Sequence, residues 1–149
     1  MVNPRAPLVT VGIDLVRRAL WFPLAVFVAH VVLACVLFAY DYFPPIDAPV
    51  HVLGGIAIAF SVWRGMDVLV STGFLAPVQP VLRGVLVFAL TSTAAVFWEF
   101  AEFVSDHTIG TRAQWGLEDT LKDMLLGIVG GLVYLAWKSF VASDGRRRP

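Results

Sequence analysis

Acidic side chains and one histidine occur at helical spacing within three separate apolar stretches of the sequence. Glu99 and Glu102 are three residues apart, which places both on one face of a helix. Asp119 and Asp123, four residues apart, form a second such pair, and His51 stands near the start of another apolar stretch. Imidazole with carboxylates suits zinc, manganese or iron, and a carboxylate-rich site also suits magnesium or calcium. The sequence therefore predicts a divalent-metal site with the candidate ligands His51, Glu99, Glu102, Asp119 and Asp123.

These carboxylates need a compensating charge wherever they lie close together. Like charges repel, and removal from water disfavours the ionised form. The cationic residues expected nearby are His51, Arg112 and Lys122. A divalent cation would offset the remaining negative charge, and it would polarise a substrate oxygen or activate water. In such a site Glu99 or Glu102 would serve as the general base.

The elements that must hold these residues are membrane-spanning helices. Hydrophobic residues make up 58% of the 149-residue chain and charged residues only 15%, against about 25% charged in soluble domains. In lipid, a helix satisfies its own backbone hydrogen bonds, whereas an open strand does not. The expected fold is therefore all-α, a polytopic bundle of about four transmembrane helices. The formal net charge is zero, so no general attraction to nucleic acid is expected.

Four apolar stretches approach the ~20 residues that a helix needs to cross the bilayer. We expect one transmembrane domain over residues 1–149 and a basic cytoplasmic tail at 142–149. The second span has two possible ends, because Arg64 and Asp67 interrupt it at a spacing that would let them pair. The predicted spans are 19–40, 46–63 or 46–70, 84–104, and 121–141.

Basic and acidic residues lie on opposite sides of these spans. Nine of the 11 basic residues fall on the side of the two termini: Arg5, Arg17, Arg18, Arg64, Arg83, Lys138, Arg146, Arg147 and Arg148. By the positive-inside rule, both termini are expected in the cytoplasm. Eight of the 11 acidic residues fall at the other side: Asp41, Asp47, Glu99, Glu102, Asp106, Glu118, Asp119 and Asp123.

Small residues continue the polar faces into the membrane. Gly54 and Gly55 follow His51, and Gly127, Gly130 and Gly131 follow Asp123. Small residues let membrane helices approach closely, so we expect the polar faces to turn inward together.

Structural roles are open for several of the acids. Asp47 and Asp119 also suit the first turn of a helix, where an acid complements the helix dipole. Asp106 and Glu118 also suit solvated connections.

His30 stands apart from these acids, in the middle of the first apolar stretch. Neutral imidazole is a good axial ligand for haem or a chlorophyll-like pigment. The alternative, which we favour, is a hydrogen bond from His30 to a neighbouring helix.

Three short strings carry a family resemblance: His51-x-x-Gly54-Gly55, Trp98-Glu99-x-x-Glu102, and Asp119-x-x-x-Asp123-x-x-x-Gly127. Together they resemble the small bacterial inner-membrane proteins of the YjdF type and, more distantly, the VanZ-like family associated with glycopeptide resistance. The resemblance covers Asp47 to Gly131. It implies a multi-span protein of the bacterial inner (cytoplasmic) membrane, and its VanZ-like side suggests envelope lipids or lipid-linked precursors.

Two classes of function follow. The first is a metal-dependent membrane enzyme acting on a lipid or lipid-linked substrate, although neither a His-Glu-x-x-His motif nor a Gly-x-Ser-x-Gly elbow is present. The second is a non-enzymatic membrane protein or an accessory subunit of a larger membrane complex, with structural or ion-binding acids. Proton or ion transport is a weaker third, because no inverted repeat is visible.

Overall fold

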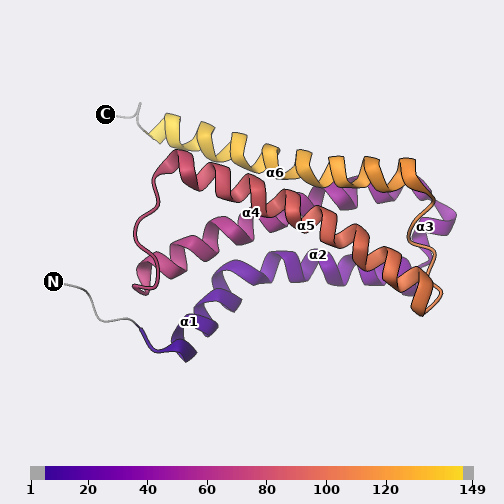
Figure 1. Ribbon diagram of the computed structural model, residues 1–149, viewed down its shortest axis with the longest axis horizontal. Coiled ribbons are helices and arrows are strands. Elements are labelled where there is room, and N and C mark those ends of the chain that lie inside the picture. Colours follow the sequence, from indigo (N-terminus) through magenta and orange to yellow (C-terminus); the bar gives the residue numbers. More distant parts are fainter. Residues whose placement is uncertain (1–5, 146–149) are drawn as a thin grey trace.

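The computed structural model describes residues 6–145, and its regular structure in that range is entirely helical (Figure 1). Four helical segments there are long and apolar enough to cross a membrane. The expected all-α architecture with four apolar helices is therefore confirmed. The four segments are Leu8–Val36, Pro44–Ser71, Pro80–Thr108 and Leu117–Gly145.

The first segment bends because it contains a proline. It consists of α1 (Leu8–Leu15), a π-helical stretch η1 (Val16–Leu20), α2 (Trp21–Val31) and a second π-helical stretch η2 (Val32–Val36). Pro23 has no N–H, and its ring crowds the carbonyl of Ala19 four residues earlier, inside η1. Figure 1 shows the resulting change of direction between α1 and α2.

The structured boundaries of this segment differ from the expected 19–40. The helix begins at Leu8, so Arg17 and Arg18 lie within it. It ends at Val36, because Phe38 adopts a left-handed conformation with φ of 50° that a helix cannot continue through. A short helix α3 (Ala39–Tyr42) and a 3-10 turn η3 (Pro44–Ile46) then lead into the second segment.

The helix α4 (Asp47–Ser71) passes without interruption through the two charges that made its end ambiguous. Asp67 lies 3.9 Å from Arg64, the spacing expected within one helix, but its shorter contact is 2.6 Å to Arg83 on the third segment. The Arg83 guanidinium also lies 3.8 Å from the Trp63 ring centroid. The charge of Asp67 is therefore offset by a partner on α5, while α4 continues to Ser71.

The last two segments are the long helices α5 (Pro80–Thr108) and α6 (Leu117–Gly145), and glycines set how closely α6 approaches its neighbours. A Cβ on Gly55 would overlap the backbone of Gly127, so α4 and α6 touch through their main chains. A Cβ on Gly131 would come within 2.8 Å of Cγ2 of Thr91 on α5. These contacts bring the polar faces of α4, α5 and α6 together.

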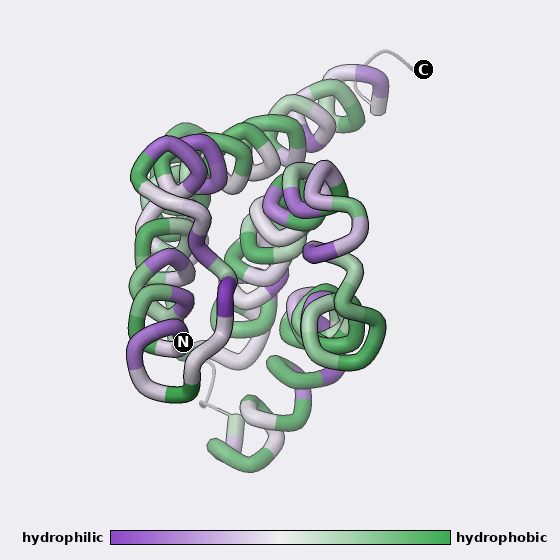
Figure 2. The backbone as a smooth tube through the Cα atoms, turned by 90° about the vertical axis from the view of Figure 1, so that its right-hand side faces the viewer, coloured by the Kyte–Doolittle hydropathy of each residue, from purple (hydrophilic) through white to green (hydrophobic). Residues whose placement is uncertain are grey.

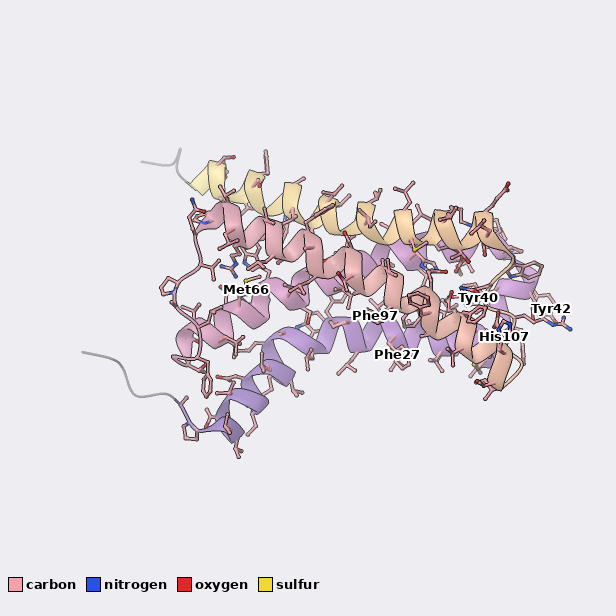
Figure 3. The ribbon with its side chains drawn as sticks, viewed as in Figure 1. Phe27, Tyr40, Tyr42, Met66, Phe97 and His107 are labelled. Carbon is pink, nitrogen blue, oxygen red and sulfur yellow. The ribbon has the colours of Figure 1, made fainter. Side chains whose placement is uncertain are left out.

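The two ends of the bundle differ in character. The first turn of α1 and the last turn of α6 lie at one end (Figure 1). A hydrophobic core of Ala59, Met66, Val87 and Tyr134 extends from the middle of the bundle toward that end. Figure 3 shows Met66 toward that end and Tyr40, Tyr42 and His107 at the other. In the end-on view of Figure 2 the helices are mostly hydrophobic, and hydrophilic residues gather toward helix ends and connections.

The basic residues of the described chain follow the expected division between the two ends. Arg17 and Arg18 lie in η1, Arg64 in the second half of α4, Arg83 in the first turn of α5 and Lys138 in the second half of α6, all toward the end that holds the termini. Lys122, in the second turn of α6, and Arg112, in the connection between α5 and α6, lie at the acidic end. Four further arginines of the predicted basic side, Arg5 and Arg146 to Arg148, lie outside the described residues.

Candidate metal centre

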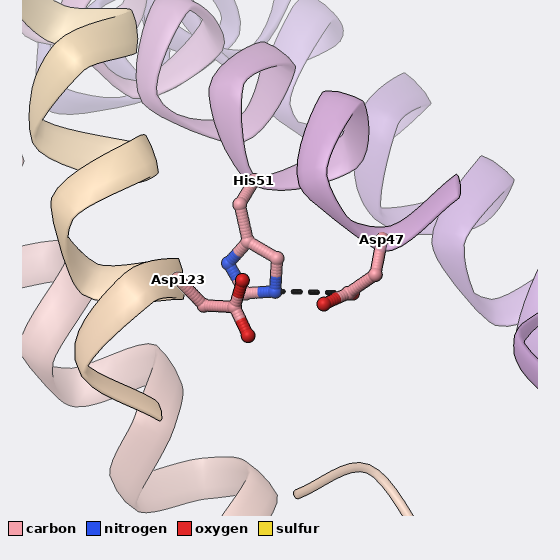
Figure 4. Close-up of side chains that lie close together, drawn as sticks. All are labelled: Asp47, His51 and Asp123. Atoms are coloured by element: carbon pink, nitrogen blue, oxygen red, sulfur yellow. Dashed lines mark ion pairs between the residues drawn. The ribbon is translucent and has the colours of Figure 1, made fainter. Parts of the chain in front are cut away.

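Three helices bring five titratable side chains together at the acidic end of the bundle. Two overlapping triplets have potential ligand atoms within 4.8 Å of one another. Asp47, His51 and Asp123 form one triplet, which Figure 4 shows as the facing side chains of α4 and α6. His51 also belongs to the other, with Glu99 and Glu102 of α5. At 1.5 Å per residue, Glu102 lies about 9 Å and Glu99 about 14 Å from the C-terminal end of α5, and Asp123 lies about 9 Å from the N-terminal end of α6.

His51 stands between two carboxylates, one beside each ring nitrogen. Its Nε2 lies 3.3 Å from Oδ1 of Asp47, and its Nδ1 lies 3.9 Å from Oε1 of Glu99 (Figure 4 shows the first contact). A neutral imidazole that donates its Nε2 proton to Asp47 turns the lone pair of Nδ1 toward Glu99. Two acceptors then face each other across a distance too long for a hydrogen bond. A cation between them would satisfy both.

Glu99 is held so that one carboxylate oxygen remains free. Its side chain is 5% exposed, and its Oε2 and backbone carbonyl accept hydrogen bonds from Gln114 Nε2 at 3.3 and 2.9 Å. Within residues 6–145, Oε1 is buried without a hydrogen-bond partner. The free oxygen is the one that faces Nδ1 of His51.

Gln114 reaches Glu99 because Asp106 fixes the connection between α5 and α6. The carboxylate of Asp106 accepts hydrogen bonds from the backbone N–H groups of Ala113 and Gln114 at 2.9 and 3.0 Å, and from the Thr111 hydroxyl at 2.5 Å. Asp106 is thus not a residue of a solvated connection; it lies within α5, and its role is to hold the connection that follows. Asp106 affects the centre indirectly, by holding the loop that carries Gln114.

Glu102, 8% exposed, is oriented by an aromatic neighbour on its own helix. Trp98 donates from Nε1 to Oε1 of Glu102 at 2.8 Å. The indole is fixed in turn by edge-on contacts with Phe27 and His30 of α2, at ring-centroid distances of 6.0 and 5.1 Å. A hydrogen bond of this kind fixes a carboxylate for metal binding.

On α6 the two predicted ligands have different surroundings. Asp123 is 3% exposed, and within the described chain its Oδ1 is buried without a hydrogen-bond partner, 3.6 Å from Nζ of Lys122. Asp119, one turn nearer the helix end, pairs with Lys122 at 2.5 Å and is absent from both triplets. The structure thus brings His51, Glu99, Glu102 and Asp123 together and leaves Asp119 at the rim.

Asp47, which the sequence places on one helix face with His51 but not among the predicted ligands, belongs to this site, and so does Gln114, which was not predicted. The signal for Asp47 was its spacing of four residues from His51, on the same helix face. Gln114 gives no such signal, because it lies in a non-helical connection.

A polar hollow of about 220 Å³ opens beside the centre, and we call it the vestibule. Asp47, Asp119 and Lys122 line it together with Tyr40 and Trp115. Tyr40, in α3 beyond the first apolar segment, lies 2.8 Å through its Oη from Nδ1 of His30. Burial, with the nearby charges of Asp47 and Glu102, raises the pKa of the Tyr40 hydroxyl, which stays protonated at neutral pH.

The spacing of the centre fits a small divalent cation. Ligand atoms bound at about 2.0–2.2 Å to a tetrahedral zinc ion are about 3.4 Å apart. The His51–Glu99 distance of 3.9 Å and the 4.8 Å limit of the triplets need only small side-chain movements to reach this value. Hydrogen bonds from Gln114 and Trp98 already orient two of the carboxylates. The cluster could therefore hold a divalent ion, with Gln114 and Trp98 orienting two of its carboxylates.

Comparison with known proteins gives one family. Residues 3–144 match the family described as "Predicted membrane protein (DUF2238)". No curated protein and no solved structure matches the chain.

Proposed function

Because the chain belongs to the DUF2238 family of predicted membrane proteins, whose description names no activity, we propose a function from the site itself. The protein binds a divalent metal ion through Nδ1 of His51 and the carboxylates of Glu99 and Glu102. Asp123 supplies a further oxygen, and Asp47 holds the imidazole in the ligating tautomer. Zinc, manganese and iron suit this ligand set best.

One observation carries the proposal. Nδ1 of His51 and the free Oε1 of Glu99 face each other at 3.9 Å. A buried carboxylate oxygen without a hydrogen bond is costly unless a cation balances it. The hydrogen bonds of Trp98 and Gln114 support the same view, because they act on the other ligand atoms and leave the central space open.

The metal centre acts, in this proposal, on a lipid or lipid-linked substrate at the outer face of the bacterial inner membrane. The excess of basic residues at the opposite end supports this orientation, with both termini in the cytoplasm. The YjdF-type and VanZ-like resemblance of the His51, Glu99 and Asp123 strings supports the inner membrane and an envelope lipid. Asp119 and Lys122 then line the route from the outer surface.

The chemistry that these residues support is hydrolysis at a phosphoryl or acyl centre. A metal ion would polarise the substrate oxygen. One of the two glutamates, Glu99 or Glu102, leaves the metal to His51, Asp123 and the other glutamate and takes a proton from water, whose oxygen bonds to the phosphorus or acyl carbon. The bond to the alcohol leaving group then breaks, and the alkoxide takes the proton back from the carboxylate.

Elemental analysis of the purified protein tests the metal centre. The protein is extracted in detergent without chelator, incubated with zinc, manganese or iron, and freed of excess ion. We expect about one bound ion per chain, and a loss of about tenfold or more in affinity for Glu99→Gln and Glu102→Gln. Glu118→Gln is the matched control, because Glu118 is an exposed acid at the same end. A wild-type protein that binds none of these ions, or a Glu99→Gln variant that binds them unchanged, refutes the proposal.

A further inference from the structure

An apolar cavity of about 130 Å³ lies next to the metal centre, deeper in the bundle, between α2, α4, α5 and α6. His51 forms part of its wall, so the cavity and the centre share one side chain. The rest of the lining is mostly hydrocarbon, including Phe27, Ile58 and Ala94. An apolar cavity of about 150 Å³ stays dry and takes up a hydrocarbon ligand. This space therefore suits an apolar group rather than water.

Small residues keep the cavity open. A Cβ on Gly54 would meet no atom within 4 Å, whereas one on the adjacent Gly55 would overlap the backbone of Gly127. Gly55 is thus required by helix packing, and Gly54 is not. Ala94 and Ala95 present similarly short side chains from α5. Since protein interiors are normally close-packed, a space that larger residues could fill points to an occupant.

The vestibule and the cavity lie on either side of the metal centre. Asp47 lines the vestibule, and the His51 it contacts lines the cavity. A polar hollow, a set of buried ligands and an apolar space therefore follow one another from the helix ends into the bundle. A molecule with a polar head and a hydrocarbon chain has the same order of parts.

We propose that the cavity holds a hydrocarbon chain of the substrate, a membrane lipid whose polar head group lies in the vestibule. The bond next to the head group then lies beside Glu99 and Glu102. The chain enters from the bilayer between α2 and α5, which both contribute to the wall. This inference rests on the proposed metal-dependent function and adds the place where a hydrocarbon chain of the substrate binds.

Photo-crosslinking tests the inference. The protein is placed in bilayers of phosphatidylethanolamine and phosphatidylglycerol that contain a phosphatidylethanolamine with a diazirine near the end of one acyl chain. In the proposal the cavity takes up only the hydrocarbon chain of the lipid, so the head group of this probe does not decide whether its chain enters. We expect crosslinks at Ile58 and Ala94, besides those at lipid-facing Phe97, which is 67% exposed.

Two cavity-filling variants and one control complete the design. Gly54→Leu and Ala94→Leu are expected to reduce crosslinking at Ile58 to background and to leave Phe97 unchanged. Gly84→Leu is the matched control, because Gly84 is also helical and a Cβ there meets nothing within 4 Å, yet it lies outside the cavity lining.

Two results would overturn the inference: no wild-type crosslink at Ile58 or Ala94, or an Ile58 crosslink unchanged in both variants. Metal content is measured on the same samples. If the wild type binds metal but gives no cavity crosslinks, only the proposed binding of a lipid chain is rejected. If it gives cavity crosslinks but binds no metal, the proposed metal centre is rejected and the binding of the chain is supported.

Discussion

Trp98 gives the sharpest test of how the centre is built. Its indole donates one hydrogen bond, at 2.8 Å to Oε1 of Glu102, and otherwise makes ring contacts with Phe27 and His30. Trp98→Phe removes the donor and keeps an aromatic ring in nearly the same place. The variant therefore separates the orientation of Glu102 from the packing of α2 against α5.

The size of the effect follows from the role of the bond. Loss of a hydrogen bond that orients a metal ligand weakens metal affinity about 10- to 100-fold. This corresponds to about 1.4–2.7 kcal/mol. A hydrogen bond to a charged group contributes about 1.5–3 kcal/mol, which is the same range. We therefore expect Trp98→Phe to bind zinc about 10- to 100-fold more weakly than the wild type.

Competition with a chromophoric zinc chelator measures this affinity in detergent. Trp137→Phe is the control, because Trp137 belongs to neither triplet of the centre; it is an exposed residue whose ring packs on Tyr134 of the hydrophobic core at a ring-centroid distance of 5.7 Å. An affinity of Trp98→Phe equal to the wild type would show that the bond to Glu102 orients no ligand. Equal weakening in both variants would assign the effect to the bundle as a whole.

Three further predictions concern packing, orientation and the opposite end. Gly55→Val should lower the thermal midpoint by roughly 3–10 °C, since overpacking costs about 1–3 kcal/mol. Gly54→Val should leave the midpoint nearly unchanged, and equal midpoints for the two variants would contradict the close α4–α6 contact. In cells producing a variant without the native cysteine, Ile109→Cys should react with a membrane-impermeant maleimide and Gln79→Cys should not, and the reverse pattern would invert the proposed orientation. Asp67→Asn should destabilise the protein by about 1–2 kcal/mol in thermal melts, because it removes a 2.6 Å ion pair that is only partly exposed; an unchanged midpoint would show that this pair is dispensable.

The fold could be predicted from the sequence because it depends on few properties. Length and apolar character limit each stretch to a membrane helix, and backbone hydrogen bonding excludes the alternatives. The boundaries were harder. The charge of Asp67, which made the end of α4 ambiguous, is paired with Arg83, which lies 16 residues away and belongs to another helix, so local spacing did not reveal that pair. The bend at η1 follows from Pro23, but its direction depends on packing.

The candidate centre was partly predictable for a similar reason. Helical spacing groups Glu99 with Glu102 and relates Asp123 to Asp119, because residues three or four apart share a face. Spacing does not reveal which positions along that face lie level with the polar residues of the neighbouring helices. Asp119 falls one turn too near the end of α6 and is paired with Lys122 instead.

The supporting residues were the least predictable part of the site. Gln114 lies in an irregular connection that Asp106 folds back over Glu99, and no periodic pattern describes such a segment. Trp98 was visible in the sequence, yet its N–H could face lipid, water or Glu102. Only the packing of its ring against Phe27 and His30 selects the last.

The two long connections of the protein consequently differ in what they permit an experimenter to do. The segment between α4 and α5 lies at the end of the bundle opposite the centre (Figure 1), so an epitope or a fluorescent tag inserted next to Gln79 leaves the acids of the centre in place. The segment between α5 and α6 holds Gln114 against Glu99 through backbone N–H groups that Asp106 anchors. Any insertion there detaches a carboxylate on α5 from its support, although the inserted residues would lie outside the helices.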